Sequence, residues 1–221
     1  MEAYTMIDTF SEKLTSAIKA NVKGVSEEKA EIINYGINLL IYDIVVFTLV
    51  FSASLLLGIF NYVLASVAVI AMLRLYAGGA HTRSRLQCFF VYILTIFGIV
   101  YLAKSVQLPS LWVSTPVFLL GLGLLWLYAP GDTEEKPILS KKLIKRQRIV
   151  SFAALLLVWA ASLVFWRFDL IVHTVIVLSV IPVLFLLSPL GYRACKCKRG
   201  EAAVHNTYND SSIIQVTEEV K

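Results

Sequence analysis

His81 and Cys88 stand seven positions apart and are the residues of this chain best suited to nucleophilic chemistry. A thiol that gives its proton to an imidazole forms the simplest pair of nucleophile and base in proteins. Seven residues of continuous helix would separate the two side chains by about 10 Å along the axis, whereas proton transfer needs heavy atoms about 3 Å apart. The pair therefore works together only if the chain turns back between them, and the polar residues 82–87 predict that turn.

Arg74 and a pair of glycines, Gly78 and Gly79, precede the histidine. Arg74 lies about two helical turns before His81, in an apolar zone where an arginine is costly. It either extends toward the lipid headgroups or points into a cleft, and we favour the second reading. There its charge would favour the thiolate of Cys88 and bind a substrate carboxylate or a developing oxyanion. The glycines permit either close helix packing or an extended backbone whose N–H groups face a substrate.

The chain that must position these groups has the composition of a membrane protein. Of its 221 residues, 58% are hydrophobic and 16% are charged, which exceeds the apolar share of soluble domains. The apolar residues form blocks of about 20 residues, the length that crosses a bilayer as a helix. We therefore predict an all-α polytopic membrane protein with six transmembrane helices, at residues 36–60, 62–80, 89–107, 111–128, 149–166 and 170–190.

The basic residues predict how this fold is oriented. Eighteen of the 20 Lys and Arg lie in the predicted cytoplasmic segments, and only Lys104 and Arg167 lie elsewhere. The positive-inside rule then places both termini, His81 and Cys88 on the cytoplasmic side of a cell membrane. This distribution explains the net charge of +5 without a nucleic acid partner. The polar start of the chain, which carries acidic residues, indicates no cleavable secretory signal.

The sequence divides into three parts. Residues 1–35 form an amphipathic segment that either lies flat in the headgroup region or packs on the cytoplasmic loops. In its functional form this segment would position a second amphipathic peptide. Residues 36–190 form the transmembrane domain, and residues 191–221 form a basic, flexible cytoplasmic tail. The apolar residues of the first part recur at helical spacing: Ile7, Phe10, Leu14, Ile18 and Val22.

Asp43 is an ionisable residue within the first predicted span, where it needs a partner or a wet cavity. Three roles stay open for it. It orients His81 as a third member of the catalytic set, it pairs with Arg74, or it forms a hydrogen bond between helices.

A metal site would depend on the tail residues Cys195, Cys197 and His205. No pair among them has the usual C-x2-C spacing, and the cysteines are too few and too badly spaced for a disulfide framework. We therefore expect no metal, no cofactor and reduced thiols.

Residues 129–148 combine a turn-forming part with a basic run. A charged stop that fixes topology accounts for this run. The sharper alternative is a face that attracts an acidic peptide to the cytoplasmic mouth of the site, with salt-sensitive binding. The candidate substrate-binding residues are Lys141, Lys142, Lys145 and Arg146.

Two motifs in this chain resemble the AgrB family, the membrane cysteine peptidases that process precursors of quorum-sensing peptides. The order and spacing of one set resemble the active-site segment of that family: Arg74, Gly78, Gly79, His81 and Cys88. A second set resembles the second cytoplasmic loop of the family: Ala129-Pro130, Asp132-Thr133 and Lys136-Pro137. Both lie at the expected places in a six-span layout.

The resemblance implies a bacterial enzyme with Cys88 as nucleophile, His81 as base and Arg74 as an essential site residue. Such an enzyme cleaves the C-terminal acidic tail from a short AgrD-like precursor through an acyl-thioester. A thiol of the precursor then attacks the thioester and closes a thiolactone ring.

Two other classes remain open from the residues alone. A small transporter or receptor would use Arg74, His81 and Asp43 to bind a ligand or relay protons, and a structural membrane partner would need neither His81 nor Cys88. A homodimer is a further hypothesis, because glycine-rich helix faces favour close packing.

Overall fold

A computed structural model of the chain confirms the all-α class. The described residues contain eight helices and two isolated bridges. They form two compact units, Met1–Gly58 and Ile59–Lys221, and each is described by itself. The structure describes residues 2–22, 25–81, 85–108, 111–134, 138 and 140–200.

The first unit holds two helices, α1 (Glu2–Asn21) and α2 (Glu27–Leu56). Helix α2 begins well before the predicted span at residue 36. The reason is the N-terminal cap, because the Ser26 hydroxyl accepts a hydrogen bond from the N–H of Lys29 at 3.4 Å. Such a cap satisfies one of the unpaired N–H groups that every helix N-terminus leaves.

Helix α1 packs on α2 through polar side chains. Ser11 and Thr15 are buried, and Asn38 of α2 donates to the carboxylate of Asp8 and to the Ser11 hydroxyl. The amphipathic segment of the sequence analysis is therefore tied to the first transmembrane candidate rather than separate from it. Its apolar stripe is left exposed, as a lipid-headgroup contact would require: Phe10 is 55% exposed, Leu14 39% and Val22 52%.

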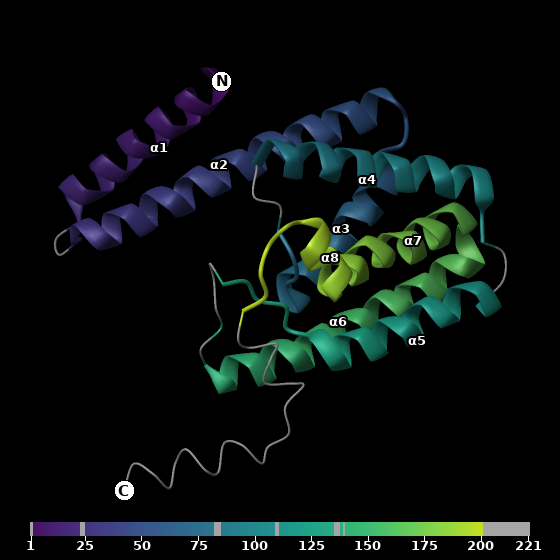
Figure 1. Cartoon of the computed structure of the whole chain (residues 1–221). Helices are drawn as coiled ribbons and strands as arrows, with labels where there is room; N and C mark the ends of the chain where they lie inside the picture. Colours follow the sequence, from purple (N-terminus) through teal and green to yellow (C-terminus); the bar gives the residue numbers. More distant parts are fainter. Residues whose placement is uncertain are drawn as a thin grey trace, which may run out of the picture. The chain divides into compact units, whose positions relative to one another are not determined.

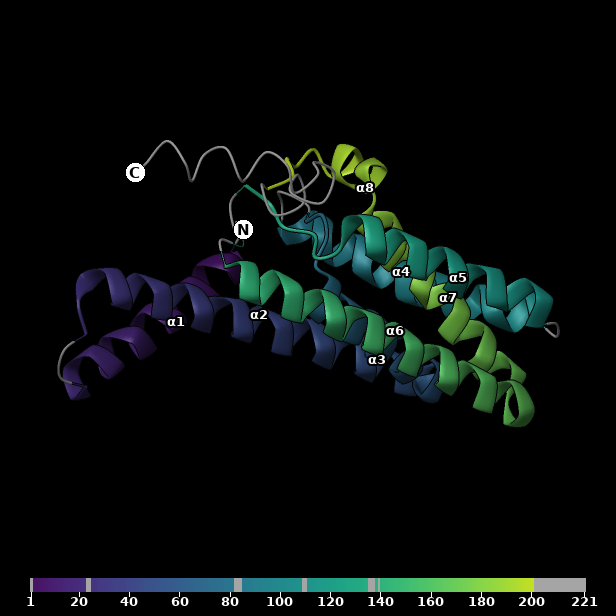
Figure 2. The same cartoon turned by 90° about the horizontal axis from the view of Figure 1, so that it is seen from below.

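The second unit is built around one central helix, α7 (Leu170–Leu187). This helix contacts α3, α4, α5, α6 and α8, and it runs through the middle of the unit in Figures 1 and 2. It is the most apolar of the long helices, and most of its residues are buried. A helix that is apolar all round needs partners on every side. The surrounding helices are α3 (Phe60–Ala77), α4 (Arg85–Val106), α5 (Leu111–Tyr128), α6 (Lys141–Phe168) and α8 (Pro189–Ala194).

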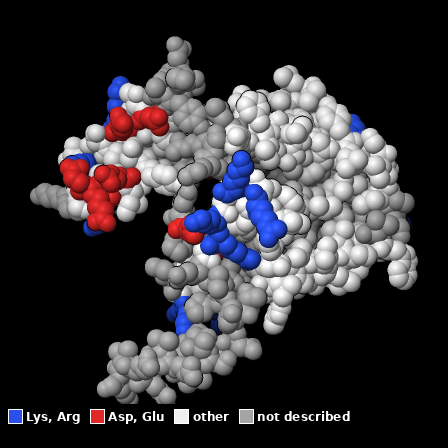
Figure 3. Space-filling view, viewed as in Figure 1, with Lys and Arg blue, Asp and Glu red and all other residues white. Residues whose placement is uncertain are grey.

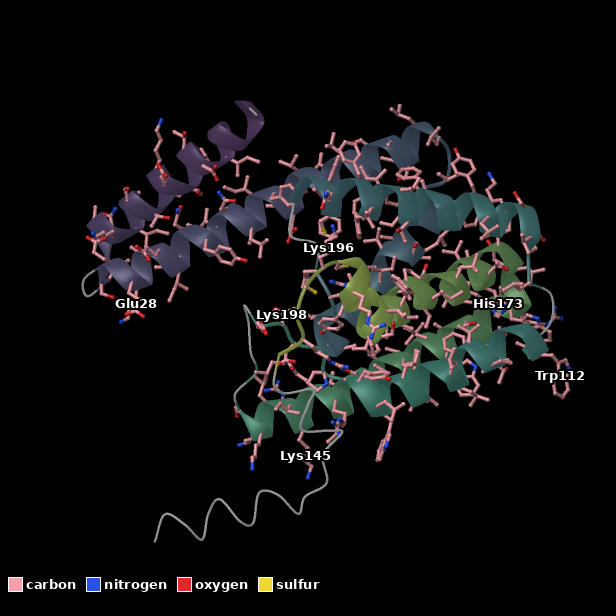
Figure 4. All side chains as sticks on the ribbon, in the orientation of Figure 1. Glu28, Trp112, Lys145, His173, Lys196 and Lys198 are labelled. Carbon is pink, nitrogen blue, oxygen red and sulfur yellow. The ribbon has the colours of Figure 1, made fainter. Side chains whose placement is uncertain are left out.

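Few polar groups lie inside this bundle, and most of them bond between helices. Ser179 of α7 donates to the Ser66 hydroxyl of α3 at 2.9 Å. His173 is fully buried, and its Nδ1 lies 2.8 Å from the carbonyl oxygen of Ser162. Figure 4 shows His173 far along α7 from the segment that carries Lys196 and Lys198. His173 is therefore a packing residue of the bundle interior.

Within the described ranges, five helices are long and apolar enough to cross a membrane: α2, α3, α4, α6 and α7. In α5 the described apolar stretch is shorter, Ser114–Tyr128. The chain is thus a polytopic membrane protein, with five candidate spans where the sequence analysis predicted six. Helix α6 also begins earlier than predicted, at Lys141 rather than residue 149, because the basic run belongs to the helix itself.

Candidate active site

Helix α3 ends at Ala77, four residues before the histidine. Gly78 caps it with φ 69° and ψ −143°, a region of backbone conformation that is essentially restricted to glycine. Gly79 follows with φ 118°. His81 therefore lies beyond the helix end, although the sequence analysis expected the helix to reach it. Residues 82–84 of the predicted turn lie outside the described residues, and α4 resumes at Arg85 with Cys88 in its first turn.

The segment after α3 is held by main-chain hydrogen bonds to the loop that contains Gly131 and to the end of α7. The N–H of Gly79 donates to the carbonyl of Gly131 at 3.0 Å, and the N–H of Gly131 donates to the carbonyl of Ala77 at 2.7 Å. The N–H of Ala80 donates to the carbonyl of Leu186 at 2.8 Å. These N–H groups are engaged within the protein, so they do not face a substrate. The glycine pair serves the close approach of these segments.

Three helix C-termini converge at this place, and this explains the pattern of bonds. The last four carbonyls of a helix have no partner within it, and they carry partial negative charge. The N–H of Gly131 donates to a carbonyl at the end of α3, and the N–H of Ala80 donates to a carbonyl at the end of α7. At the end of α5, the Arg148 Nε donates to the carbonyl of Ala129 at 3.0 Å. The site is therefore a place where helix ends are neutralised by loop N–H groups and arginines.

We expect Gly78→Ala to destabilise the protein by about 2 kcal/mol or more, because backbone strain of this kind costs about 1–3 kcal/mol. A Cβ at Gly78 would also lie 2.2 Å from the carbonyl oxygen of Gly131. The measurement is the unfolding temperature of the purified protein in detergent. Gly123→Ala is the matched control, because a Cβ at this helical position meets nothing within 4 Å. Equal unfolding temperatures for the two variants would contradict the close approach described here.

Arg74 turns its guanidinium toward the loop that carries the histidine. Its Nη2 lies 3.0 Å from the carbonyl oxygen of Ala80 and 3.2 Å from Nδ1 of His81. The same nitrogen lies 3.5 Å from Nε2 of His81, so the guanidinium lies against the imidazole ring as a donor. The Arg74 Nη1 is buried and has no hydrogen-bond partner among the described residues. One nitrogen of Arg74 thus holds the loop that carries His81.

Cys88 is exposed, and it lies within electrostatic range of Arg74 and of two further thiols. Burial, and then the neighbouring Cys197, raise the pKa of Cys195; Arg74 acts in the opposite direction, and Cys88 adds to the rise. All three cysteines of the chain are therefore gathered near one guanidinium. The sequence analysis expected Cys195 and Cys197 to lie in a flexible tail.

The basic run forms the first two turns of α6 and points outward. Its exposed members are the four candidate substrate-binding residues, Lys141, Lys142, Lys145 and Arg146. Arg148 differs from them, because it turns inward to Ala129. Figure 3 shows Lys and Arg gathered at the end of the second unit where α8 and the start of α6 lie, and Figure 4 labels Lys145 there.

The other predicted residues fall in three groups. Asp43 lies on α2, in the first unit, and its three open roles stay predictions. Lys136, Pro137 and His205 lie outside the described residues. No group of three or more His, Cys, Asp or Glu in the described part of the chain is arranged to hold a metal ion.

The sequence analysis missed two contributors to this site. The Leu186 carbonyl acts through its main chain, so no side-chain signal marks it. The Tyr192 hydroxyl donates to the carbonyl of Asp132 at 2.8 Å, and only the motif that includes Asp132 hinted at the importance of this loop.

Comparison with known proteins gives one consistent result. A sequence model of accessory gene regulator B (AgrB) matches residues 11–187. A putative AgrB-like protein of Clostridium perfringens (strain SM101 / Type A) is 30% identical over 149 residues, which are 65% of this chain and 69% of that protein. The accessory gene regulator protein B of Staphylococcus aureus (strain bovine RF122 / ET3-1) is 27% identical over 136 residues, 62% of this chain and 72% of that protein. No solved structure matches the chain.

Proposed function

The chain belongs to the AgrB family, and from that premise we propose that it is a membrane cysteine peptidase. Its substrate is an AgrD-like propeptide, from which it removes the C-terminal tail. The retained part is then closed into a thiolactone ring and becomes a signalling peptide.

The observation that carries this proposal is the contact of Arg74 with His81, within electrostatic range of an exposed thiol. The guanidinium lies 3.2 Å from His81 Nδ1 and interacts electrostatically with Cys88. A nucleophile, a base and a residue that orients the base form the minimal set for covalent catalysis. Nothing of this kind surrounds His173, whose Nδ1 is occupied by Ser162 in the core.

The chemistry proceeds in two acyl transfers. His81 takes the proton of Cys88, and the sulfur attacks a peptide carbonyl of the precursor. The C–N bond breaks, the tail leaves with an amine that takes a proton from His81, and the acyl group stays on Cys88 as a thioester. A thiol of the precursor then attacks that thioester, which gives the ring and returns the thiol of Cys88. Exchange of one thioester for another preserves the energy of the acyl bond, so a cysteine enzyme suits ring closure.

Arg74 has a second role in this scheme. The tetrahedral intermediate carries negative charge on the former carbonyl oxygen, and preorganised donors at that point lower the barrier. The N–H groups of Gly79 and Ala80 are already engaged, whereas Nη1 of Arg74 is buried without a hydrogen-bond partner among the described residues. We therefore assign the oxyanion to Arg74 rather than to the glycine backbone.

The basic run binds the acidic tail of the precursor. Lys141 and Lys142 in the first turn of α6 are unfavourable for the helix itself, because the N-terminus of a helix carries partial positive charge and a cation in its first turn costs about 0.3–1 kcal/mol. An anionic partner offsets this cost. The same helix end has no acidic residue in its first turn, so that partner comes from outside the helix.

Neutralising the basic run should weaken binding of the precursor without slowing the chemistry. We expect Lys141→Gln, Lys142→Gln, Lys145→Gln and Arg146→Gln together to raise KM about tenfold, which is about 1.4 kcal/mol, with kcat nearly unchanged. The difference should shrink as salt increases, since salt screens exposed charges. Lys104→Gln, at the other end of the fold, is the control. A fall in kcat with constant KM would contradict a binding role.

We propose six spans in all, with α5 as the sixth beside the five candidates. Its 18 residues extend about 27 Å as a helix, close to the thickness of the hydrocarbon core. Both termini and the active site are then cytoplasmic, as the distribution of Lys and Arg predicts. Cysteine accessibility at Lys104→Cys and at Lys141→Cys should show opposite sides of the membrane.

The direct test is co-expression with an AgrD-like precursor encoded by an adjacent short reading frame, followed by mass spectrometry. The proposal expects a peptide that has lost its C-terminal tail and one further water, the mass of a ring. An unchanged precursor in cells that contain folded protein would reject the peptidase, and would favour the transporter or receptor class.

A further inference from the structure

The segment after α7, which the sequence analysis expected to be flexible, is folded over residues 191–200. We call this segment the C-terminal clasp. It contains the end of α8 (Pro189–Ala194) and a strand-like stretch in which Arg199 pairs with Thr133 in an antiparallel bridge. Main-chain bonds continue this pairing, from Glu134 N–H to the Lys198 carbonyl at 3.4 Å and from Gly200 N–H to the Asp132 carbonyl at 3.3 Å.

Tyr192 is the first anchor of the clasp. It is only 4% exposed, and its hydroxyl donates to the carbonyl of Asp132 at 2.8 Å. The hydroxyl also lies 2.8 Å from where a Cβ of Gly131 would stand, so the tyrosine packs directly on the loop. Burial raises the pKa of Tyr192 to about 12, although Arg199 acts in the opposite direction. The hydroxyl therefore keeps the proton that it donates at any physiological pH.

Arg199 is the second anchor. Its Nη2 donates to the carbonyl of Tyr128, at the C-terminus of α5, at 2.9 Å. Its guanidinium carbon lies 4.8 Å from the centre of the Tyr128 ring and 5.4 Å from that of Tyr192. A cation over aromatic faces and beside a helix C-terminus is stabilised by both. Arg199 thus joins both aromatic rings to the end of α5.

The loop that these anchors hold is the one that supports the histidine. Gly131 lies next to Asp132 in the chain, and it exchanges hydrogen bonds with Gly79 and Ala77. Ala80 follows Gly79, and its carbonyl accepts from the same Arg74 nitrogen that contacts His81. A displacement of the Asp132 carbonyl therefore also moves the neighbouring Gly131, and with it the segment that carries His81.

We propose that Tyr192 and Arg199 are positioning residues for the peptidase reaction, which act by fixing the loop from Tyr128 to Thr133 against the segment from Ala77 to His81. This inference rests on the proposed function. The clasp touches the active-site segment through the loop, so its loss affects the rate of acyl transfer rather than the capture of the precursor by the basic run. The residues of the clasp are not themselves catalytic.

The test compares Tyr192→Phe and Arg199→Ala with Lys196→Gln, an exposed residue of the same segment. Tyr192→Phe keeps the ring and removes only the hydroxyl. We expect each of the first two variants to lower kcat for precursor cleavage about tenfold, with KM within twofold of the unaltered protein. Their unfolding temperatures should stay high enough that all of the enzyme is folded during the assay. Lys196→Gln should behave as the unaltered protein. Because both anchors act on one loop, the double variant should lose less than the product of the two effects.

A second readout needs no precursor. The rate at which iodoacetamide alkylates Cys88 at pH 7.5, followed by peptide mapping, reports how Arg74 and His81 support the thiolate. We expect it to fall severalfold in Tyr192→Phe and Arg199→Ala, and Arg199→Lys should recover part of it. Rates of cleavage and alkylation equal to those of the unaltered protein in both variants would overturn the positioning role. The same conclusion would follow if the rates fell only in proportion to the amount of folded protein. If the unaltered protein cleaves no precursor but alkylation changes as expected, the proposed function fails and the clasp stands.

Discussion

Replacing Cys88 by alanine should abolish cleavage of the precursor. Without its sulfur there is no acyl-enzyme, and loss of a nucleophile from a covalent mechanism costs several orders of magnitude. We expect the rate to fall at least about 1000-fold, below detection by mass spectrometry of the peptide. Expression and folding should be unchanged, because the Cys88 side chain is exposed.

The same experiment identifies which of the three gathered thiols is the nucleophile. A precursor that cannot provide its own thiol should leave the acyl group on Cys88, and mass spectrometry of the intact protein should find that adduct. The double variant Cys195→Ser and Cys197→Ser should still carry it. An adduct on Cys195 or Cys197, or cleavage by Cys88→Ala at the normal rate, would remove Cys88 from the mechanism.

Replacing His81 by alanine should lower kcat/KM about 100-fold to 10,000-fold, which is the usual contribution of a general base. The deficit should narrow as the pH rises from 7 toward 9, because base in solution can then remove the thiol proton that His81 would take. Added imidazole should restore part of the rate at pH 7. The measurement is the pH dependence of kcat/KM for both proteins in the same detergent.

Arg74 gives this prediction a useful comparison. A higher pH or added imidazole can substitute for a missing general base, whereas neither can substitute for a missing donor to the oxyanion. Arg74→Lys keeps a positive charge but loses the planar guanidinium, whose Nη2 contacts both Ala80 and His81 and whose Nη1 we assign to the oxyanion, and neither treatment should rescue it. If His81→Ala retained full activity at pH 7, the histidine would be a structural partner of Arg74 and the base would lie elsewhere.

The membrane helices and the family could be predicted from the sequence. Apolar blocks of about 20 residues are unstable in water, so hydropathy alone identifies membrane helices. It predicted the approximate positions of the long apolar helices. The spacing of Arg74, His81 and Cys88 also suggested a turn between the two chemistry-bearing residues, and α3 does end before His81. The ends of helices were less accurate, because caps such as Ser26 act through a single hydrogen bond.

The surroundings of the site depended on the tertiary structure. Unpaired carbonyls at the ends of α3, α5 and α7 must find donors, and nothing in a linear sequence says that these three ends meet. The donors come from Ala80, Gly131 and Arg199, which are up to 119 positions apart in the chain. For this reason residues 191–200 looked like a polar tail in the sequence, and only their pairing with the loop around Asp132 gave them a place beside the active-site segment.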